Sequence, residues 1–202
     1  MARITPPVCR LCRRAGEKLF LKGEKCFSAK CPVDRRRTAP GMHPQGRRRQ
    51  SDYALQMREK QKVRLTYGLM EQQFRRYVEK AQANPKATGT VLFQLLEARL
   101  DNVLYRAGVA DSRPMARQIV RHGHVTVNGR KVNIPSFSVR ANDVIGWREA
   151  SKKSEMYKQL ETDAPKRNVA GWLTFDKAKM ETKVLRLPEA QDLEVKDRKS
   201  VV

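Results

Sequence analysis

All four cysteines of this 202-residue chain lie within its first 31 residues. Cys9 and Cys12 form a C-x2-C pair, and Cys26 and Cys31 form a C-x4-C pair after an interval of 13 residues. Four thiolates can occupy the corners of a tetrahedron around Zn²⁺, and short pairs on tight turns bring them together. Because the surrounding segment has few large apolar side chains, a metal ion would organise what a core cannot. The spacing therefore predicts a structural zinc site.

Two other uses of these cysteines stay open from the residues alone, namely disulfide bonds and unrelated free thiols. Disulfide frameworks suit small secreted chains. The opening residues MARITP do not begin a signal peptide, however, and no apolar run approaches the length needed to span a membrane. Unrelated free thiols would be scattered along the chain, whereas these four are confined to one end. We therefore favour zinc.

Positive charge is concentrated in the same part of the chain. The net charge is +22, and residues 1–64 hold 18 Lys or Arg against 5 Asp or Glu. A polyphosphate partner fits such a density, because each neutralised phosphate releases counterions. An anionic membrane surface is the competing partner, but Pro and Gly interrupt the basic segment and no apolar helix face accompanies it. We expect a nucleic acid and no membrane.

Residues 32–50 are rich in Pro, Gly and Arg and have no apolar period, so that alone they should be extended or disordered. They could form a solvated linker. We favour an arm that follows a phosphate backbone, because blocks of basic charge often bind nucleic acid. Its expected contacts are Arg35, Arg36, Arg37, Arg47, Arg48 and Arg49.

Apolar residues at helical spacing predict a series of helices after this arm. Ser51 and Ser112 are expected N-caps, and glycines follow three of the helices as left-handed stops. Asn84-Pro85 should end the second helix. The expected helices span residues 51–67, 70–83, 90–107 and 112–122.

Short strands follow. The first is expected at Val125 and Val127 and the second at Val132 and Ile134. Asn128-Gly129 stands between these alternating apolar residues, which is the strongest short-range signal for a β-hairpin. A third strand is expected at residues 143–147, a helix and then a charged linker over residues 151–168, and a docking tail from Trp172 onward.

These elements predict an α+β protein. It would have a mostly helical N-terminal domain with a zinc-organised basic segment, and a small module built of a helix-turn-helix and an antiparallel hairpin. The expected parts are residues 1–50 (zinc segment and basic arm), 51–95 (helices of the first domain), 96–157 (the module) and 158–202 (a linker and a C-terminal tail packing on the first domain).

Candidate RNA contacts lie on both parts. In the first domain they are Tyr53, Arg58, Lys60, Lys62 and Arg64. In the module, arginines recur every four residues along one expected helix, which would place three guanidinium groups on one face. The module candidates are Arg99, Arg113, Arg117, Arg121, His122 and Asn128.

The module residues resemble a known family. The stretches LEARLDNV (96–103), SR (112–113) and HGHVTVNG (122–129) are similar to the small RNA-binding module of ribosomal protein four of the small subunit. The stretches APGMH (39–43), SDY (51–53), REKQK (58–62) and YG (67–68) resemble that ribosomal protein itself. The resemblance covers nearly the whole chain, and the cysteines match its zinc-bearing bacterial form.

The resemblance implies a structural constituent of the small ribosomal subunit, located in cytoplasmic ribosomes. Proteins of this family bind a multi-helix junction in the 5′ domain of small-subunit ribosomal RNA and help to nucleate assembly. They neighbour small-subunit protein five, and this boundary influences translational accuracy. The arm near Arg47 to Arg49 matches the part that lines the channel through which messenger RNA enters. Family members usually finish with a longer segment that ends in an acidic and aromatic cluster, whereas this sequence ends at Ser200-Val201-Val202.

A catalytic alternative depends on Arg99-Leu100-Asp101, which is similar to the triplet carrying the essential Asp of pseudouridine synthases. In those enzymes a large catalytic domain follows the module, whereas only about fifty residues follow Trp147 here. We expect Asp101 to cap a helix or to pair with a nearby arginine instead. The three histidines offer no base and nucleophile pair. We predict a protein that is not an enzyme and has no small-molecule substrate, with a free RNA-binding or RNA-modifying factor as the alternative.

Overall fold

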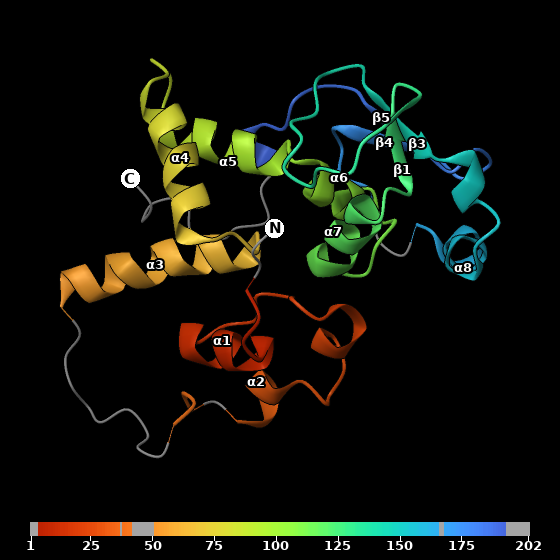
Figure 1. Cartoon of the computed structure of the whole chain (residues 1–202). Coiled ribbons are helices and arrows are strands. Elements are labelled where there is room, and N and C mark those ends of the chain that lie inside the picture. Colours follow the sequence, from red (N-terminus) through yellow and green to blue (C-terminus); the bar gives the residue numbers. More distant parts are fainter. Residues whose placement is uncertain (1–3, 37, 42–50, 166–167, 193–202) are drawn as a thin grey trace. The chain divides into compact units, whose positions relative to one another are not determined.

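The computed structural model describes residues 4–36, 38–41, 51–165 and 168–192 (Figure 1). The chain divides between Ala83 and Asn84 into two compact units, each described by itself below. We predicted that the first domain would extend to residue 95, but helix α5 (Thr88–Glu97) belongs to the second unit. Hydrogen bonds explain the difference, because Gln94 on α5 donates to the carbonyl of Pro188 within that unit at 3.3 Å.

The first unit begins with short elements around a small core. These are α1 (Val8–Ala15), the 3-10 turn η1 (Gly23–Cys26) and α2 (Pro32–Arg35). Cys12, Leu19 and Leu21 are buried together, which fits a segment poor in large apolar residues. The predicted extended arm begins with α2 instead, and Arg37 and residues 42–50 lie outside the described residues.

Two longer helices complete the first unit, and both were predicted. Helix α3 (Asp52–Thr66) begins after Ser51, whose hydroxyl accepts a hydrogen bond from the Ala54 N–H at 3.3 Å. Gly68 follows the helix with φ +64°, the left-handed conformation that favours glycine. Helix α4 (Glu71–Gln82) buries Phe74 and Ala81.

The second unit begins with α5, α6 (Leu100–Arg106) and α7 (Arg113–Arg121). The prediction of one helix over residues 90–107 was wrong, because the chain is extended at Arg99. The carbonyl of Ala98 accepts from the N–H of Val139 at 2.8 Å, and Leu100 N–H donates to the carbonyl of Phe137 at 2.9 Å. A distant loop thus interrupts a locally continuous apolar pattern.

A five-stranded antiparallel sheet follows, in the order β2-β1-β3-β5-β4. The predicted hairpin is confirmed, with β1 (Val125–Val127) as its first strand and β3 (Val144–Trp147) as the predicted third strand. Its second strand, β2 (Arg130–Lys131), ends before Val132 and Ile134, where we expected it, because the two-residue turn pairs Arg130 with Val127 and Lys131 with Thr126. The turn has φ of +50° at Asn128 and +79° at Gly129, as a type I′ turn requires.

The tail differs from its prediction. We expected residues beyond 158 to form a linker and then pack on the first domain. Instead β4 (Leu173–Asp176) and β5 (Glu181–Val184) extend the module's sheet, with β5 paired to β3. The physical reason is apolar burial, because Trp172, Met180 and Val184 join the core that α6 and α7 share with the sheet.

The remaining described elements are α8 (Glu155–Asp163) and the turns η2 (Glu149–Ser151) and η3 (Ala190–Asp192). The Ser154 hydroxyl caps α8, and Tyr157 and Leu160 bury one side of it. Among the described residues, no helix combines the length and the apolar character needed to cross a bilayer.

Candidate nucleic-acid interface and cysteine site

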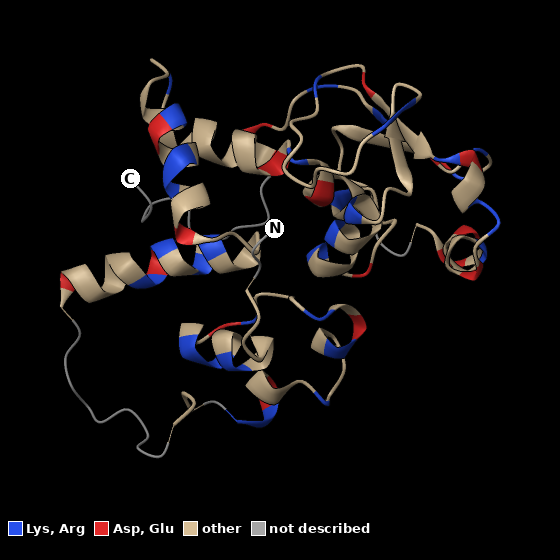
Figure 2. Cartoon of the chain, viewed as in Figure 1, with Lys and Arg blue, Asp and Glu red and all other residues tan. Residues whose placement is uncertain are grey.

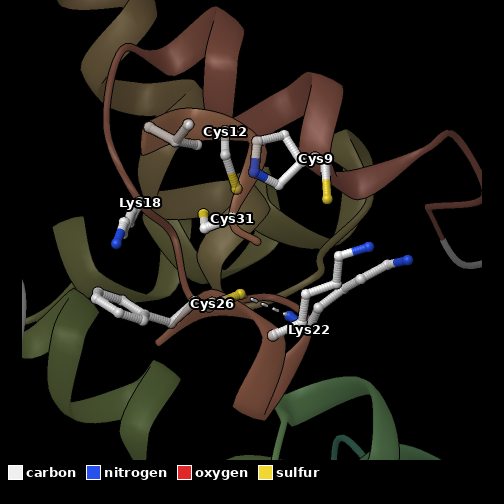
Figure 3. A pocket seen from close by; sticks show the side chains of 10 residues that line it. Cys9, Cys12, Lys18, Lys22, Cys26 and Cys31 are labelled. Carbon is white, nitrogen blue, oxygen red and sulfur yellow. Dashed lines mark hydrogen bonds between the residues drawn. The ribbon is translucent and has the colours of Figure 1, made fainter. Parts of the chain in front are cut away.

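The four cysteines lie around one small cavity of about 10 Å³ (Figure 3). Cys9 and Cys12 come from α1, Cys26 ends η1, and Cys31 immediately precedes α2. All four are free thiols. The predicted pairs are therefore brought together by two short turns, in a space comparable to a single water-sized sphere.

The chemistry of this cavity fits a zinc ion. Burial raises the pKa of the Cys12 thiol, a hydrogen bond with the Leu19 backbone acts against this rise, and the other three cysteines add to it. The backbone N–H of Lys22 donates to Cys26 Sγ at 3.4 Å, and such a hydrogen bond would support a thiolate if it held a metal ion. No described group of three or more His, Cys, Asp or Glu side chains is already set at metal-binding spacing. The fit to a zinc ion therefore depends on the four sulfur donors and on the cavity that they share.

The basic residues of α3 are largely paired with acidic neighbours. Lys60 Nζ lies 2.5 Å from a Glu71 carboxylate oxygen, and Arg64 Nε lies 3.4 Å from the other. Lys62 Nζ lies 2.7 Å from Glu59. The hydrogen bond from Lys60 lowers the pKa of Glu71, and although burial acts against it, hydrogen bonding to Glu59 raises the pKa of Lys62. These cations already have carboxylate partners.

The other candidates of the first unit differ in accessibility. Tyr53 is exposed at the start of α3, and Arg58 is half-buried further along that helix. Arg35 and Arg36 are exposed at the end of α2. The candidates Arg37, Arg47, Arg48 and Arg49 lie outside the described residues.

Two module arginines point inward. Arg99 is 1% exposed, and its Nη2 lies 2.8 Å from Asp101 Oδ2. Arg113 is 8% exposed, stacks over the Tyr105 ring at 4.3 Å and donates from Nε to Asn102 Oδ1 at 2.7 Å. The expected pairing of Asp101 with an arginine is confirmed. The expectation that Arg113 shares an accessible face with Arg117 and Arg121 is corrected, because α6 covers its side of α7.

A buried polar network, which the sequence reasoning missed, holds α5 to α6. Glu97 accepts from Arg106 Nε at 2.7 Å and from Asn102 Nδ2 at 2.8 Å. Breaking a buried ion pair of this kind costs about 3–5 kcal/mol, since one charge is left without compensation. The sequence did hold a signal for this network, because these polar residues stand among the apolar residues that predict a buried helix face.

Accessible basic and imidazole side chains lie where α7 ends. Arg121 and His122 are exposed, and half-buried Arg117 approaches Asp101 at 3.3 Å. Burial lowers the pKa of Arg117. A Cβ built on Gly123 would lie only 2.6 Å from Lys131 Cε, so the lysine of β2 crosses directly over this glycine. The sequence reasoning omitted Lys131, because its place over α7 depends on how the hairpin folds back.

Asn128 is mainly a structural residue in this fold. Its Nδ2 donates to Asp143 Oδ1 at 2.8 Å, and its Oδ1 accepts from the Val144 N–H at 2.9 Å. The side chain predicted to contact RNA therefore ties the hairpin turn to the start of β3.

Figure 2 shows Lys and Arg recurring along α1, α3 and α7.

A helix-and-hairpin module with accessible cations at one helix end, joined to a basic helical unit, defines a class of structured-RNA binders. Residues 3–97 match the family described as Ribosomal protein S4/S9 N-terminal domain, and residues 98–145 match the S4 domain. The chain belongs to the family of small ribosomal subunit protein uS4. The S4-domain match ends at residue 145, before the end of β3, so β4 and β5 lie beyond the matched part.

The curated relatives resemble this chain over almost their whole length. Small ribosomal subunit protein uS4A of Symbiobacterium thermophilum is 54% identical over 96% of this chain and 93% of its own. The uS4 protein of Pelotomaculum thermopropionicum is 53% identical over the same shares. The uS4A protein of Alkaliphilus oremlandii is 50% identical over 100% of this chain and 97% of its own.

Proposed function

We propose that this chain is a structural constituent of the small ribosomal subunit and a primary binder of its ribosomal RNA. The observation that carries the proposal is the identity of about half of all residues to proteins named small ribosomal subunit protein uS4, over nearly the full length. The accessible cations of both units agree with it, because phosphate neutralisation supplies affinity for folded RNA.

In the second unit, the proposed RNA surface is the end of α7 with the hairpin beside it. Arg121, His122 and Lys131 would contact the backbone of a folded junction, with Arg117 behind them. Such surfaces recognise RNA by shape and phosphate position rather than by base sequence. Arg99 and Arg113 act as supports, since each is buried against partners inside the unit.

In the first unit, the proposed contacts are Arg35, Arg36, Tyr53 and Arg58, with Lys60, Lys62 and Arg64 held in place by their carboxylate partners. The arm bearing Arg37 and Arg47 to Arg49 would line the channel through which messenger RNA enters. By family resemblance, the chain would nucleate assembly of the 5′ domain, neighbour small-subunit protein five and thereby influence translational accuracy.

We also propose a structural zinc ion held by Cys9, Cys12, Cys26 and Cys31. Four sulfur ligands make a closed tetrahedral site, which stabilises a fold and leaves no position for a substrate. The support is the donor set around one cavity, together with a surrounding core of few residues.

Sedimentation tests the ribosomal role. A tagged chain produced in its source cells should remain with small subunits after washing at moderate salt. Replacing both Arg121 and Lys131 by Gln should reduce this retention. The control replaces Lys177 and Lys179, which are exposed after β4 in the same unit, and should be retained like the parent. Release of the parent at moderate salt would instead indicate a free RNA-binding factor.

A further inference from the structure

Two phenylalanines stack on each other at the cysteine segment. The ring centroids of Phe20 and Phe27 are 5.0 Å apart with an interplanar angle of 27°. Phe20 is 37% exposed and Phe27 is 63% exposed, so much of the stack faces solvent. Large aromatic side chains are usually buried for most of their area. This pair presents a flat apolar surface instead.

The local backbone holds the stack in place. Phe20 has φ +50°, a left-handed conformation that is costly for a bulky side chain. It is kept there by its neighbours Leu19 and Leu21, which are both buried in the small core. Phe27 follows η1, and its N–H donates to the carbonyl of Glu24 at 3.0 Å. Two tight segments thus fix the two rings against each other.

Three lysines lie in the same segment as this aromatic pair. Lys18, Lys22 and Lys25 line the same cavity as Phe20. Lys18 is paired with Asp34 at 2.6 Å, whereas Lys22 and Lys25 are exposed. Residues 4–36 hold nine Lys or Arg against three Asp or Glu. The occupant of the surface should therefore be anionic.

An unpaired nucleotide has both a flat aromatic face and negative charge, the two properties that this surface can bind. Its base offers a flat π-face for the outer ring, and its phosphates can meet the lysines. An acidic protein segment would satisfy the charge but would gain little from a flat stacked pair. A bilayer would require a wider apolar face than two rings provide.

We propose that Phe20 and Phe27 form a stacking platform for one unpaired base of the bound RNA. The outer ring is Phe27, Phe20 supports it from beneath, and Lys22 and Lys25 contact the flanking phosphates. This inference depends on the proposed function, because it assumes that the chain binds small-subunit ribosomal RNA.

The test compares Phe27→Leu with Phe27→Trp in the full-length protein. The probe is protein-free small-subunit ribosomal RNA, titrated at fixed salt, with the chemical reactivity of each unpaired base recorded at saturation. Stacking of one base on an aromatic ring is sequence-tolerant and is lost with the ring. The leucine variant should bind about tenfold more weakly, and one protected base should become reactive. The tryptophan variant should bind like the parent and keep the protection.

Circular dichroism and thermal unfolding check that each variant keeps its fold. If Phe27→Leu disturbs it, Phe20→Leu provides the second variant and should cause a smaller loss of the same protection. Equal affinity and identical base reactivity for the leucine and tryptophan variants would overturn the platform while leaving the proposed function standing. Failure of the parent to bind this RNA would overturn the proposed function itself.

Discussion

The arginines of the second unit serve two purposes that depend on their burial. Arg99 and Arg113 are enclosed and satisfied by Asp101, Asn102 and the ring of Tyr105. Arginine suits such positions because its planar guanidinium combines stacking with directed hydrogen bonds. Arg121 lies on α7, like Arg113, yet its side chain is exposed and available to a phosphate.

Replacing Arg121 or Arg113 by Gln should separate these purposes. Arg121→Gln should reduce the slope of log affinity against log salt by about 0.7–0.9 and leave stability unchanged, since one phosphate contact is lost. Arg113→Gln should lower the free energy of unfolding by about 2 kcal/mol, because a charged hydrogen bond and a ring contact disappear. Salt titrations and urea unfolding measure the two effects. Similar losses of stability in both variants would contradict this assignment.

His124 should make the second unit sensitive to acid. Its Nδ1 lies 3.0 Å from Ser151 Oγ, and its ring lies near Trp147. Burial, and then the charge of His122, lowers the pKa of His124 below its usual value of about 6.5. The unfolded chain therefore binds the proton more readily, so stability is fully present above the usual pKa and falls as the pH drops below it.

Unfolding measured between pH 5 and 8 should show this loss, and His124→Gln should flatten the curve in that window. His122→Gln should have a smaller effect in the same direction, because it removes only the secondary cause. An unchanged slope in His124→Gln would refute the role of this histidine.

Local chemistry decided which helices and strands were predictable. Ser51, Ser112 and Asn128-Gly129 act on the few residues beside them, and their helices and hairpin are confirmed. The break between α5 and α6 was not predictable, because it comes from backbone hydrogen bonds to Phe137 and Val139. No residue near Arg99 in the sequence predicts a contact with the loop that carries Phe137 and Val139, and the apolar pattern continues across the break.

Gly129 in the hairpin turn and Gly146 in β3 provide a test of that turn. Gly129→Ala should destabilise the second unit by about 1–2 kcal/mol, because φ of +79° forces a Cβ into the left-handed region. Gly146→Ala is the control, since its Cβ would meet Glu181 Cγ and Thr126 Oγ1 at 3.5 Å, an ordinary contact. Urea unfolding of the two variants should differ accordingly. Equal stability would mean that the turn is not a constraint.

At the level of the complete chain, the predicted boundary at residue 95 lies close to the junction of the two family matches at residues 97 and 98, whereas the compact units divide at residues 83 and 84, and the tail was misplaced. The cysteine spacing predicted a zinc site, which stays a prediction, and Cys9, Cys12, Cys26 and Cys31 line one cavity. The strands β4 and β5 have only four residues each, too few for a clear alternating pattern. Spacing along a helix likewise identifies a face but not what covers it, which is why the burial of Arg113 was missed.

Removing the proposed zinc ion should affect one unit only. With a strong chelator, amide exchange should accelerate over residues 8–36, because their small core includes Cys12, one of the proposed ligands. Residues 84–165 should keep their protection, since their core contains no cysteine. Exchange measured by mass spectrometry distinguishes the segments. A Cys26→Ser/Cys31→Ser variant should show the fast exchange without chelator. Equal acceleration in both units would contradict separate stabilisation.

The pairing of β5 between β3 and β4 has a consequence for synthesis. While the polypeptide is being made, the hairpin and β3 emerge early, but β3 keeps an open edge until residue 184 has left the ribosome. An open edge of this kind invites pairing with other chains. Maturation of the module must therefore wait until β5 has emerged, and newly made copies should need shielding until that moment.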